Sequence, residues 1–453
     1  MIMAEETCAV RQGGVNVKVE VVAGVTTFLT MAYIIFVNPS ILSLEGIGAE
    51  GIERMDKQAL IAVTCIVSAL ATIIVGVFAR APIAMAPGMG LNAFFAYSLV
   101  LTDKVHWQTA LGVVFLSGLF FLILTFLGLR RKLVEAIPGS LISAISVGIG
   151  LFITFIGLKN LGIIVKGSEA TLVKAGELTG TVLIGLCGLV VMIFLEIRKV
   201  KGSLLIGILA STILAGVFGY VRMPSEWISL DMDIRPVAFR LDILGALRWS
   251  LLGSIFTLMF IDMFDSVGTL VACCHQAKMV DANNRIRGLD RLLGIDAAAT
   301  MLGAVLGTST TTSYIESAAG IEQGGRTGLT SIVTGFMFLL ALLFSPIARI
   351  VPAYATAPAL VMVGLFMIKE VRKIDFGNIE EGFPAFIIMV MIALSYSIST
   401  GLAFGFVSFT LIKVVCGKGR EVKPAMWVIG FLSLVFLTVD RLGAVIGYIR
   451  GLV

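Results

Sequence analysis

Long apolar stretches, separated by short polar intervals, fill most of the 453-residue chain. A helix that crosses a bilayer needs about 20 mostly apolar residues. The pattern predicts fourteen spans, at about 18–43, 58–79, 82–102, 107–128, 139–162, 178–197, 202–221, 247–273, 291–307, 307–324, 327–345, 352–369, 383–399 and 401–416. A further apolar stretch, 425–439, is either one more helix or a segment lying in the membrane interface.

The composition agrees with an all-α polytopic membrane protein. Apolar residues make up 58% of the chain and charged residues 14%, whereas an average soluble domain is about 25% charged. These values exclude a soluble enzyme, a disordered chain and a nucleic-acid-binding domain. The six cysteines show neither metal-ligand spacing nor a disulfide framework. Residues 1–16 are polar and lack the apolar core of a signal peptide, so we expect no cleavage.

The positions of lysine and arginine predict an orientation. If the N-terminus lies in the cytoplasm and the spans alternate, the larger share of these residues falls on the cytoplasmic side, including the clusters at 130–132 and 198–201. The acidic loop 45–57 then lies outside. Because cytoplasmic loops of membrane proteins are enriched in positive charge, we expect the N-terminus inside and the plasma (inner) membrane as the location.

Two similar segments suggest an internal repeat. Residues 134–153 and 348–367 both have an Ile-Pro or Val-Pro step, then small residues, then an apolar ending that includes Gly-Leu-Phe. They lie seven spans apart, and an odd number of spans gives the two copies opposite orientations. The sequence therefore predicts a seven-plus-seven inverted repeat.

The same offset of seven spans pairs the third span, 82–102, with the tenth, 307–324. Both have an unusual composition for membrane helices. The third contains Pro87 and Gly88 near its start, and the tenth begins with a run of threonine and serine at 308–313. Irregular backbone is tolerated at membrane depth only where protein or a cavity surrounds it. We expect each span to be a short extended piece followed by a half-helix, and paired interruptions of this kind indicate a transporter site.

Carboxyl groups within the spans are the strongest candidates for chemistry, because ionisable groups are costly there. Asp262 and Asp265 lie three residues apart on one helix face, and Glu316 lies in the interrupted tenth span. Without a basic partner, such acids can carry a proton, so all three are candidates for proton coupling. A hydrogen-bonded structural role is the alternative. Asp296, close to Arg291, fits an ion-paired anchor.

Neutral side chains complete the candidate site. The amide of Asn92 can donate and accept, although it could instead bond the backbone at the start of a half-helix. Phe94 and Tyr314 flank the polar groups and could stack on a flat ring, with plain packing as the alternative. Carboxylates suit a cation or a neutral ligand with several N–H donors. A purine base fits this pattern, and an amino acid or a polyol fits part of it.

Four motifs resemble the AzgA-type purine permeases, a branch of the nucleobase–cation symporters related to the uracil and xanthine permeases. They are TFLTMAYIIFVNPSIL (27–42), APGMGLNAFFAY (86–97), FIDMFDSVGTL (260–270) and GTSTTTSYIESAAGIEQGGRTGLTSIV (307–333). The resemblance covers about residues 13–440 and implies fourteen spans in two inverted repeats. It implies a core domain from 17–128 and 247–346, a gate domain from 129–222 and 347–417, and a C-terminal tail at 418–453.

The resemblance also implies a secondary active transporter that imports hypoxanthine, guanine or adenine by proton symport, with an elevator-like or rocking movement. It places the base between Asp265, Glu316 and Asn92. The uracil permeases have a histidine where this chain has Thr269, which favours Asp265 or Asp262 as the proton carrier. It implies no cofactor or metal and a homodimer through the gate domains. Sodium coupling, an anion carrier of the same architecture and a channel stay open as alternatives.

Overall fold

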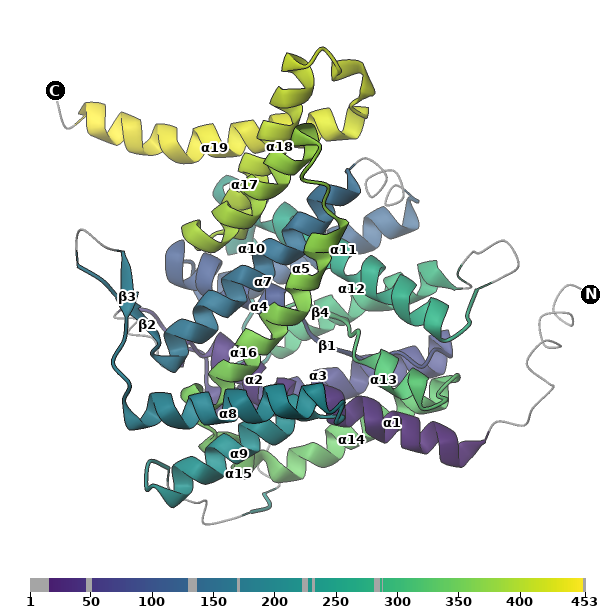
Figure 1. Ribbon diagram of the computed structural model, residues 1–453. Coiled ribbons are helices and arrows are strands. Elements are labelled where there is room, and N and C mark those ends of the chain that lie inside the picture. Colours follow the sequence, from purple (N-terminus) through teal and green to yellow (C-terminus); the bar gives the residue numbers. More distant parts are fainter. Residues whose placement is uncertain are drawn as a thin grey trace, which may run out of the picture.

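The computed structural model describes residues 16–45, 51–128, 137–168, 172–221, 227–229, 233–280, 286 and 288–450, with the backbone alone for 439–450. The expectations for residues 1–15 and for the basic cluster 130–132 lie outside these ranges. The described chain is helical apart from two pairs of short strands and one isolated bridge (Figure 1). Strands β2 (Ile164–Lys166) and β3 (Val173–Ala175) pair in one connection between helices.

The longer helices are α1 (Val17–Met31), α2 (Ile34–Leu42), α3 (Lys57–Ile74), α5 (Trp107–Phe126), α7 (Gly139–Leu161), α8 (Gly180–Ile197), α9 (Ser203–Val217), α11 (Leu252–Gln276), α12 (Leu289–Leu306), α14 (Gly328–Ala341), α16 (Ala353–Ile368), α17 (Ile379–Ser395), α18 (Ile398–Val415) and α19 (Pro424–Arg450). Among the described residues, nine helical stretches are long and apolar enough to cross a membrane. The prediction of an all-helical membrane protein is therefore confirmed, whereas the number of fourteen spans stays a prediction.

Most helices begin and end within a few residues of the predicted stretches, and the thirteenth is shifted toward the N-terminus. That stretch was expected at 383–399, but α17 ends at Ser395 because Tyr396 adopts a left-handed conformation with φ 55°. The Ser397 hydroxyl then accepts a 3.2 Å hydrogen bond from the Thr400 backbone N–H and caps the start of α18.

The two interrupted spans have the predicted form of an extended piece followed by a helix. Strand β1 (Met85–Pro87) leads into α4 (Met89–Ala93), which continues as the π-helical turn η2 (Phe94–Thr102), and strand β4 (Thr311–Ser313) leads into α13 (Ser317–Glu322). The strands pair antiparallel, with Met85 opposite Ser313 and Pro87 opposite Thr311. This pairing satisfies backbone groups that a bilayer could not hydrogen-bond.

Close contacts between small residues set the packing of the other helices. A Cβ added to Gly364 of α16 would lie 2.6 Å from the Gly150 carbonyl oxygen of α7. Helices α7, α16, α17 and α18 pack on one another, and α1 and α3 both pack on α14. The division into core and gate domains stays a prediction.

Candidate functional site

The strand pair lies in the interior of the protein, between helices that are far apart in the sequence (Figure 1). Every residue of β1 and β4 is buried, and so are Thr308, Ser309 and Thr310 before β4. The hydroxyl-rich run therefore contacts protein on all sides, which explains why a sequence unsuited to a lipid-facing helix is tolerated here.

Glu316 lies between β4 and α13, immediately before the first residue of that helix. Its carboxylate Oε1 accepts a 2.7 Å hydrogen bond from the Tyr33 hydroxyl, and its backbone carbonyl accepts a longer, 3.4 Å bond from Thr30. The side chain is half-buried. Glu316 is thus held by the first span while part of the residue stays accessible.

Asp265 on α11 faces the same region. Its side chain is exposed and interacts electrostatically with Glu316 and with Tyr314. Tyr314 is only 6% exposed, and its hydroxyl donates to the carbonyl oxygen of Pro87 in β1. The structure therefore brings together Asp265, Glu316 and Tyr314.

Sequence analysis did not single out Tyr33, although it lies within the quoted motif 27–42. A usable signal exists, because Tyr33 is a hydroxyl-bearing aromatic residue in the middle of a predicted span. It lies at the break between α1 and α2, where the backbone leaves regular helical hydrogen bonding.

Asn92 is completely buried in α4, and protein groups engage both ends of its amide. Its Nδ2 donates to Asn38 Oδ1 at 2.7 Å, and its Oδ1 accepts from the Ser309 hydroxyl. Asn38 in turn donates to Thr64 at 2.7 Å and to Thr308 at 3.2 Å. This network joins α4 to α2, α3 and the segment before β4. In this conformation Asn92 therefore fixes the position of the half-helix.

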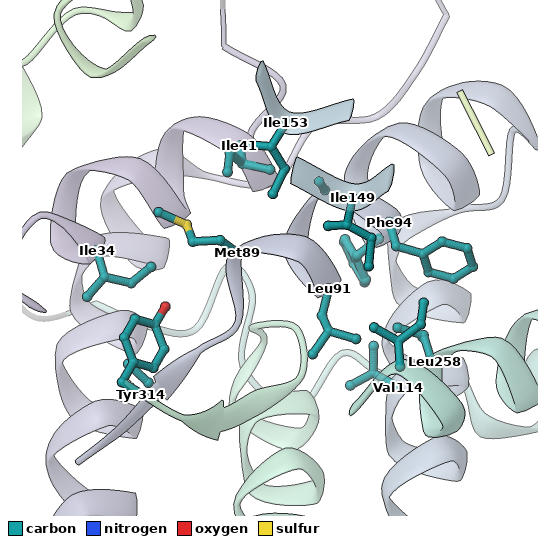
Figure 2. Close-up of a cluster of buried hydrophobic side chains, with 14 of the residues drawn as sticks. Ile34, Ile41, Met89, Leu91, Phe94, Val114, Ile149, Ile153, Leu258 and Tyr314 are labelled. Carbon is teal, nitrogen blue, oxygen red and sulfur yellow. The ribbon is translucent and has the colours of Figure 1, made fainter. Parts of the chain in front are cut away.

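Phe94 lies in an apolar part of the interior. Figure 2 shows its ring on the far side of α4 from Tyr314, in the region of Ile149 and Leu258. It is 1% exposed and belongs to the hydrophobic core. Phe94 therefore backs the half-helix and does not join Asp265 and Glu316.

Asp262 and Asp296 form a second, deeper pair of acids behind β4. Both are completely buried and they interact electrostatically. Asp262 Oδ2 accepts a 3.1 Å bond from Thr300, whereas Oδ1 accepts none from any described residue. Asp296 accepts a 3.1 Å bond from the Ser313 backbone N–H and another from the Ser266 hydroxyl. It therefore anchors β4.

The expectation that Asp296 is an ion-paired anchor at a span entrance is wrong. Arg291 is exposed and donates a 3.3 Å hydrogen bond to the Phe78 carbonyl oxygen. The two residues are five apart on α12, which places them on different faces of the helix. Asp296 consequently points to the interior while Arg291 points outward.

The site thus has two layers with different chemistry. The accessible layer offers the carboxylates of Asp265 and Glu316, which accept hydrogen bonds, beside the Tyr33 hydroxyl. The buried layer holds Asp262 and Asp296, which can bind or release a proton. Across the part of the chain that the structure describes, no cluster of three or more His, Cys, Asp or Glu side chains could hold a metal ion.

Proteins of known structure share this fold. The transmembrane domain of a cyanobacterial bicarbonate transporter, BicA, has a TM-score of 0.63 at 16% identity, covering 85% of this chain and 98% of that one. The murine anion transporter Slc26a9 in an inward-facing state has a TM-score of 0.62 at 10% identity, covering 91% and 70%. The fold therefore defines a multi-pass membrane protein of this architecture.

Sequence comparison identifies the family. The model described as the Permease family (Xan_ur_permease) matches residues 18–404, and the chain belongs to this family. It is 40% identical to the adenine permease AdeQ of Escherichia coli K12, covering 95% of each chain. It is 42% identical to the guanine/hypoxanthine permease PbuG of Bacillus subtilis 168, covering 94% of this chain and 98% of that one. The protein is a permease and not an enzyme.

Proposed function

We propose that this protein is a secondary active transporter that imports a purine nucleobase, namely hypoxanthine, guanine or adenine, together with protons. The relatives named as adenine and guanine/hypoxanthine permeases align over nearly the whole chain, which supports this substrate class. The observation that carries the proposal is the meeting of Asp265 and Glu316 beside the strand pair, with Glu316 bonded to Tyr33 at 2.7 Å.

A purine base is flat and carries several N–H donors on its edge. In the proposal, Asp265 and Glu316 accept hydrogen bonds from that edge, and the Tyr33 hydroxyl holds the Glu316 carboxylate in position. Tyr314 contributes its ring to the wall. Asn92 and Phe94 support the site indirectly. Asn92 fixes the position of the half-helix α4, and Phe94 packs against it.

The buried acids couple proton binding to the movement of the base. Two carboxylates that are both fully buried and near each other cannot both stay charged without a large desolvation cost. We assign the coupling proton to the group formed by Asp262, Asp265 and Glu316, with Asp262 as the residue whose free oxygen takes the proton. The proton would bind from the outer side and leave to the inner side in step with the base.

Transport would move the core domain, 17–128 and 247–346, against the gate domain, 129–222 and 347–417. The binding acids lie on the core, whereas α7, α16, α17 and α18 of the gate pack mainly on one another. An elevator-like or rocking movement of one packed body against another fits this arrangement. The proposal places the protein in the plasma (inner) membrane with its N-terminus in the cytoplasm, as a homodimer through the gate domains.

An anion carrier is the main alternative, since the solved relatives of this fold include anion transporters. An anion site requires positive charge, but Asp265 and Glu316 would repel an anion. Arg326, the cation that follows α13, donates to the carbonyl oxygens of Ile321 at 2.5 Å and Gly325 at 2.7 Å, so its guanidinium is turned to its own loop. These contacts favour the nucleobase proposal.

The test is uptake of labelled adenine, guanine and hypoxanthine into proteoliposomes with an imposed pH gradient, with and without a protonophore. We expect accumulation of at least one base, lost with the protonophore, and loss of uptake in Glu316→Gln and Asp265→Asn. Glu322→Gln is the matched control, because this exposed glutamate makes surface contacts, with Lys201 at 2.9 Å and Gln276 at 3.4 Å.

Three results would contradict parts of the proposal. Wild-type uptake rates in Glu316→Gln or Asp265→Asn would show that these carboxylates do not form the substrate-binding site. Flux that ignores the pH gradient and never exceeds equilibrium would indicate a channel. Accumulation driven by a sodium gradient alone would replace the proton as the coupling ion.

A further inference from the structure

A cavity of about 440 Å³ lies between three helices. Helix α11 and the turn before it contribute Trp249, Phe256 and Phe260, α18 contributes Ser399 and Phe406, and α19 contributes Phe436. Its volume lies within the range of about 300–1,000 Å³ that is usual for pockets binding small molecules. Asp265, Glu316, Tyr33 and Tyr314 do not line it, so the cavity is separate from the site described above.

Helix α19 closes one side of this cavity. It packs on α18, and its Phe436 ring lies close to α11, 2.9 Å from a Cβ added to Gly253. The Phe260 and Phe406 rings, 5.6 Å apart and edge to face, form the opposite wall. The lining is therefore mainly aromatic and aliphatic, as expected for an apolar ligand.

Four hydroxyl-bearing residues line the cavity, Ser250, Thr257, Ser399 and Ser433. Ser399, in the first turn of α18, is 7% exposed, and its hydroxyl has no hydrogen-bond partner among the described residues. Trp249, at the start of the same bundle, is 90% exposed. Tryptophan is enriched at the headgroup level of membranes, so the side of the cavity at Trp249 suits an amphiphile with a polar group beside an apolar tail.

We propose that the cavity binds one acyl chain of a membrane phospholipid, with the ester region beside Ser399 and Trp249 and the tail running along Phe256 and Phe260. The cavity opens to the surface between apolar side chains of its own lining, since Trp249 is 90% exposed, Leu432 50% and Leu252 38%. Lipid tails are the solvent at this surface and are as apolar as the lining. An acyl chain therefore fits both the chemistry of the cavity and its position.

Bound lipid would also influence transport, and this consequence rests on the proposed function. Helix α11 belongs to the predicted core domain and α18 to the predicted gate domain, so movement between the domains changes the shape of the cavity. A ligand that fits the present shape stabilises the present conformation. The binding itself does not depend on what the protein transports.

The test counts phospholipid molecules retained on the detergent-purified protein by native mass spectrometry, before and after adding phosphatidylethanolamine. We expect one tightly retained phospholipid on the wild type and at least ten-fold lower occupancy in Ser433→Phe, which places a ring in the cavity. The matched control is Leu434→Phe, on the next residue of α19, which is 47% exposed and does not line the cavity.

Ala403→Leu fills the cavity from α18 and is the second test variant if Ser433→Phe does not fold. A thermal unfolding midpoint near that of the wild type shows that each variant is folded. Equal lipid retention in the wild type and in a folded cavity-filling variant would overturn the proposal. If a folded cavity-filling variant loses the retained lipid but takes up purine at the wild-type rate, the lipid site is supported and transport does not depend on it. Loss of uptake in Glu316→Gln with lipid retained would leave the lipid site standing.

Discussion

The hydroxyl of Tyr33 and the carboxylate of Glu316, 283 residues apart in the chain, are joined by a 2.7 Å hydrogen bond. Tyr33 lies at the break between α1 and α2, and Glu316 at the step between β4 and α13. Two places where the backbone leaves regular structure therefore meet at one carboxylate. Hydrogen bonds to a charged acceptor are stronger than neutral ones, so this contact orients the acid that the proposal assigns to substrate binding.

Tyr33→Phe removes only the hydroxyl from this contact. We expect the protein to fold and transport, with an apparent affinity for the base at least ten-fold lower, because a hydrogen bond to a charged group is worth about 1.5–3 kcal/mol. The measurement is the concentration dependence of initial uptake. Tyr354→Phe is the control, since the described residues offer no partner to that buried hydroxyl. An unchanged KM in Tyr33→Phe would show that the contact does not orient Glu316 for binding.

Asp262→Asn tests the assignment of the proton. The amide oxygen can still accept the 3.1 Å bond from Thr300, so the fold should be kept, but the side chain can no longer release a proton. We expect exchange of labelled for unlabelled base to continue while accumulation driven by a pH gradient is lost. Asp375→Asn, in an exposed turn, is the control. Full pH-driven accumulation in Asp262→Asn would exclude it as the proton carrier.

The sequence predicted the helices and the two interruptions well because both depend on local composition. Apolar length defines the spans, and Pro87 with the run at 308–313 marks where regular helix is unfavourable. It also grouped Asp265 with Glu316, since isolated acids in apolar segments are rare.

Contacts between distant segments could not be predicted in the same way. The hydrogen bond from Asn92 to Asn38 and that from Ser313 to Asp296 depend on how the helices pack. A local sequence pattern does not predict that packing. Asp296 was misinterpreted for this reason, because its neighbour in sequence, Arg291, lies on another face of α12.

Asn38 and Asn92 should be coupled in stability. Either change to alanine leaves buried polar groups of the other residue unpaired, at a cost of about 1–3 kcal/mol. The double change removes both sides of the contact, so its effect should be smaller than the sum of the single effects. Thermal unfolding of the four purified proteins measures this. Strict additivity would show that the two amides do not depend on each other.

Gly364→Ala should destabilise the packing of α16 on α7. The added Cβ would lie 1.9 Å from the Thr154 hydroxyl oxygen and 2.6 Å from the Gly150 carbonyl oxygen, and the backbone atom cannot rotate away. We expect a loss of about 1–3 kcal/mol or more, as for other overpacked interiors. Gly294→Ala, inside α12 and with nothing within 4 Å of the new atom, is the control and should be at least as stable as the wild type. Equal unfolding of both variants would contradict the close approach of these helices.

Glu380 should make stability depend on pH. Its carboxylate accepts bonds from Lys413 at 2.7 Å and Lys418 at 2.5 Å, and these bonds hold the pKa of Glu380 below its ordinary value. A carboxyl whose pKa is lower in the folded protein stabilises it above the ordinary carboxyl pKa, and this stabilisation is lost as the pH falls through the lowered value. Glu380→Gln should therefore unfold at a lower temperature than the wild type at neutral pH.

The difference between the two proteins should shrink as the pH is lowered below about 4, where the wild-type carboxyl also becomes neutral. Thermal unfolding midpoints measured across this range, for the wild type and Glu380→Gln side by side, isolate the contribution of this one group from the titration of the other acids. Glu370→Gln is the control, because Glu370 forms an exposed pair with Lys373 at 2.7 Å and such pairs contribute little. A difference that stays constant from neutral to acidic pH would show that Glu380 stabilises the protein by packing and not by its charge.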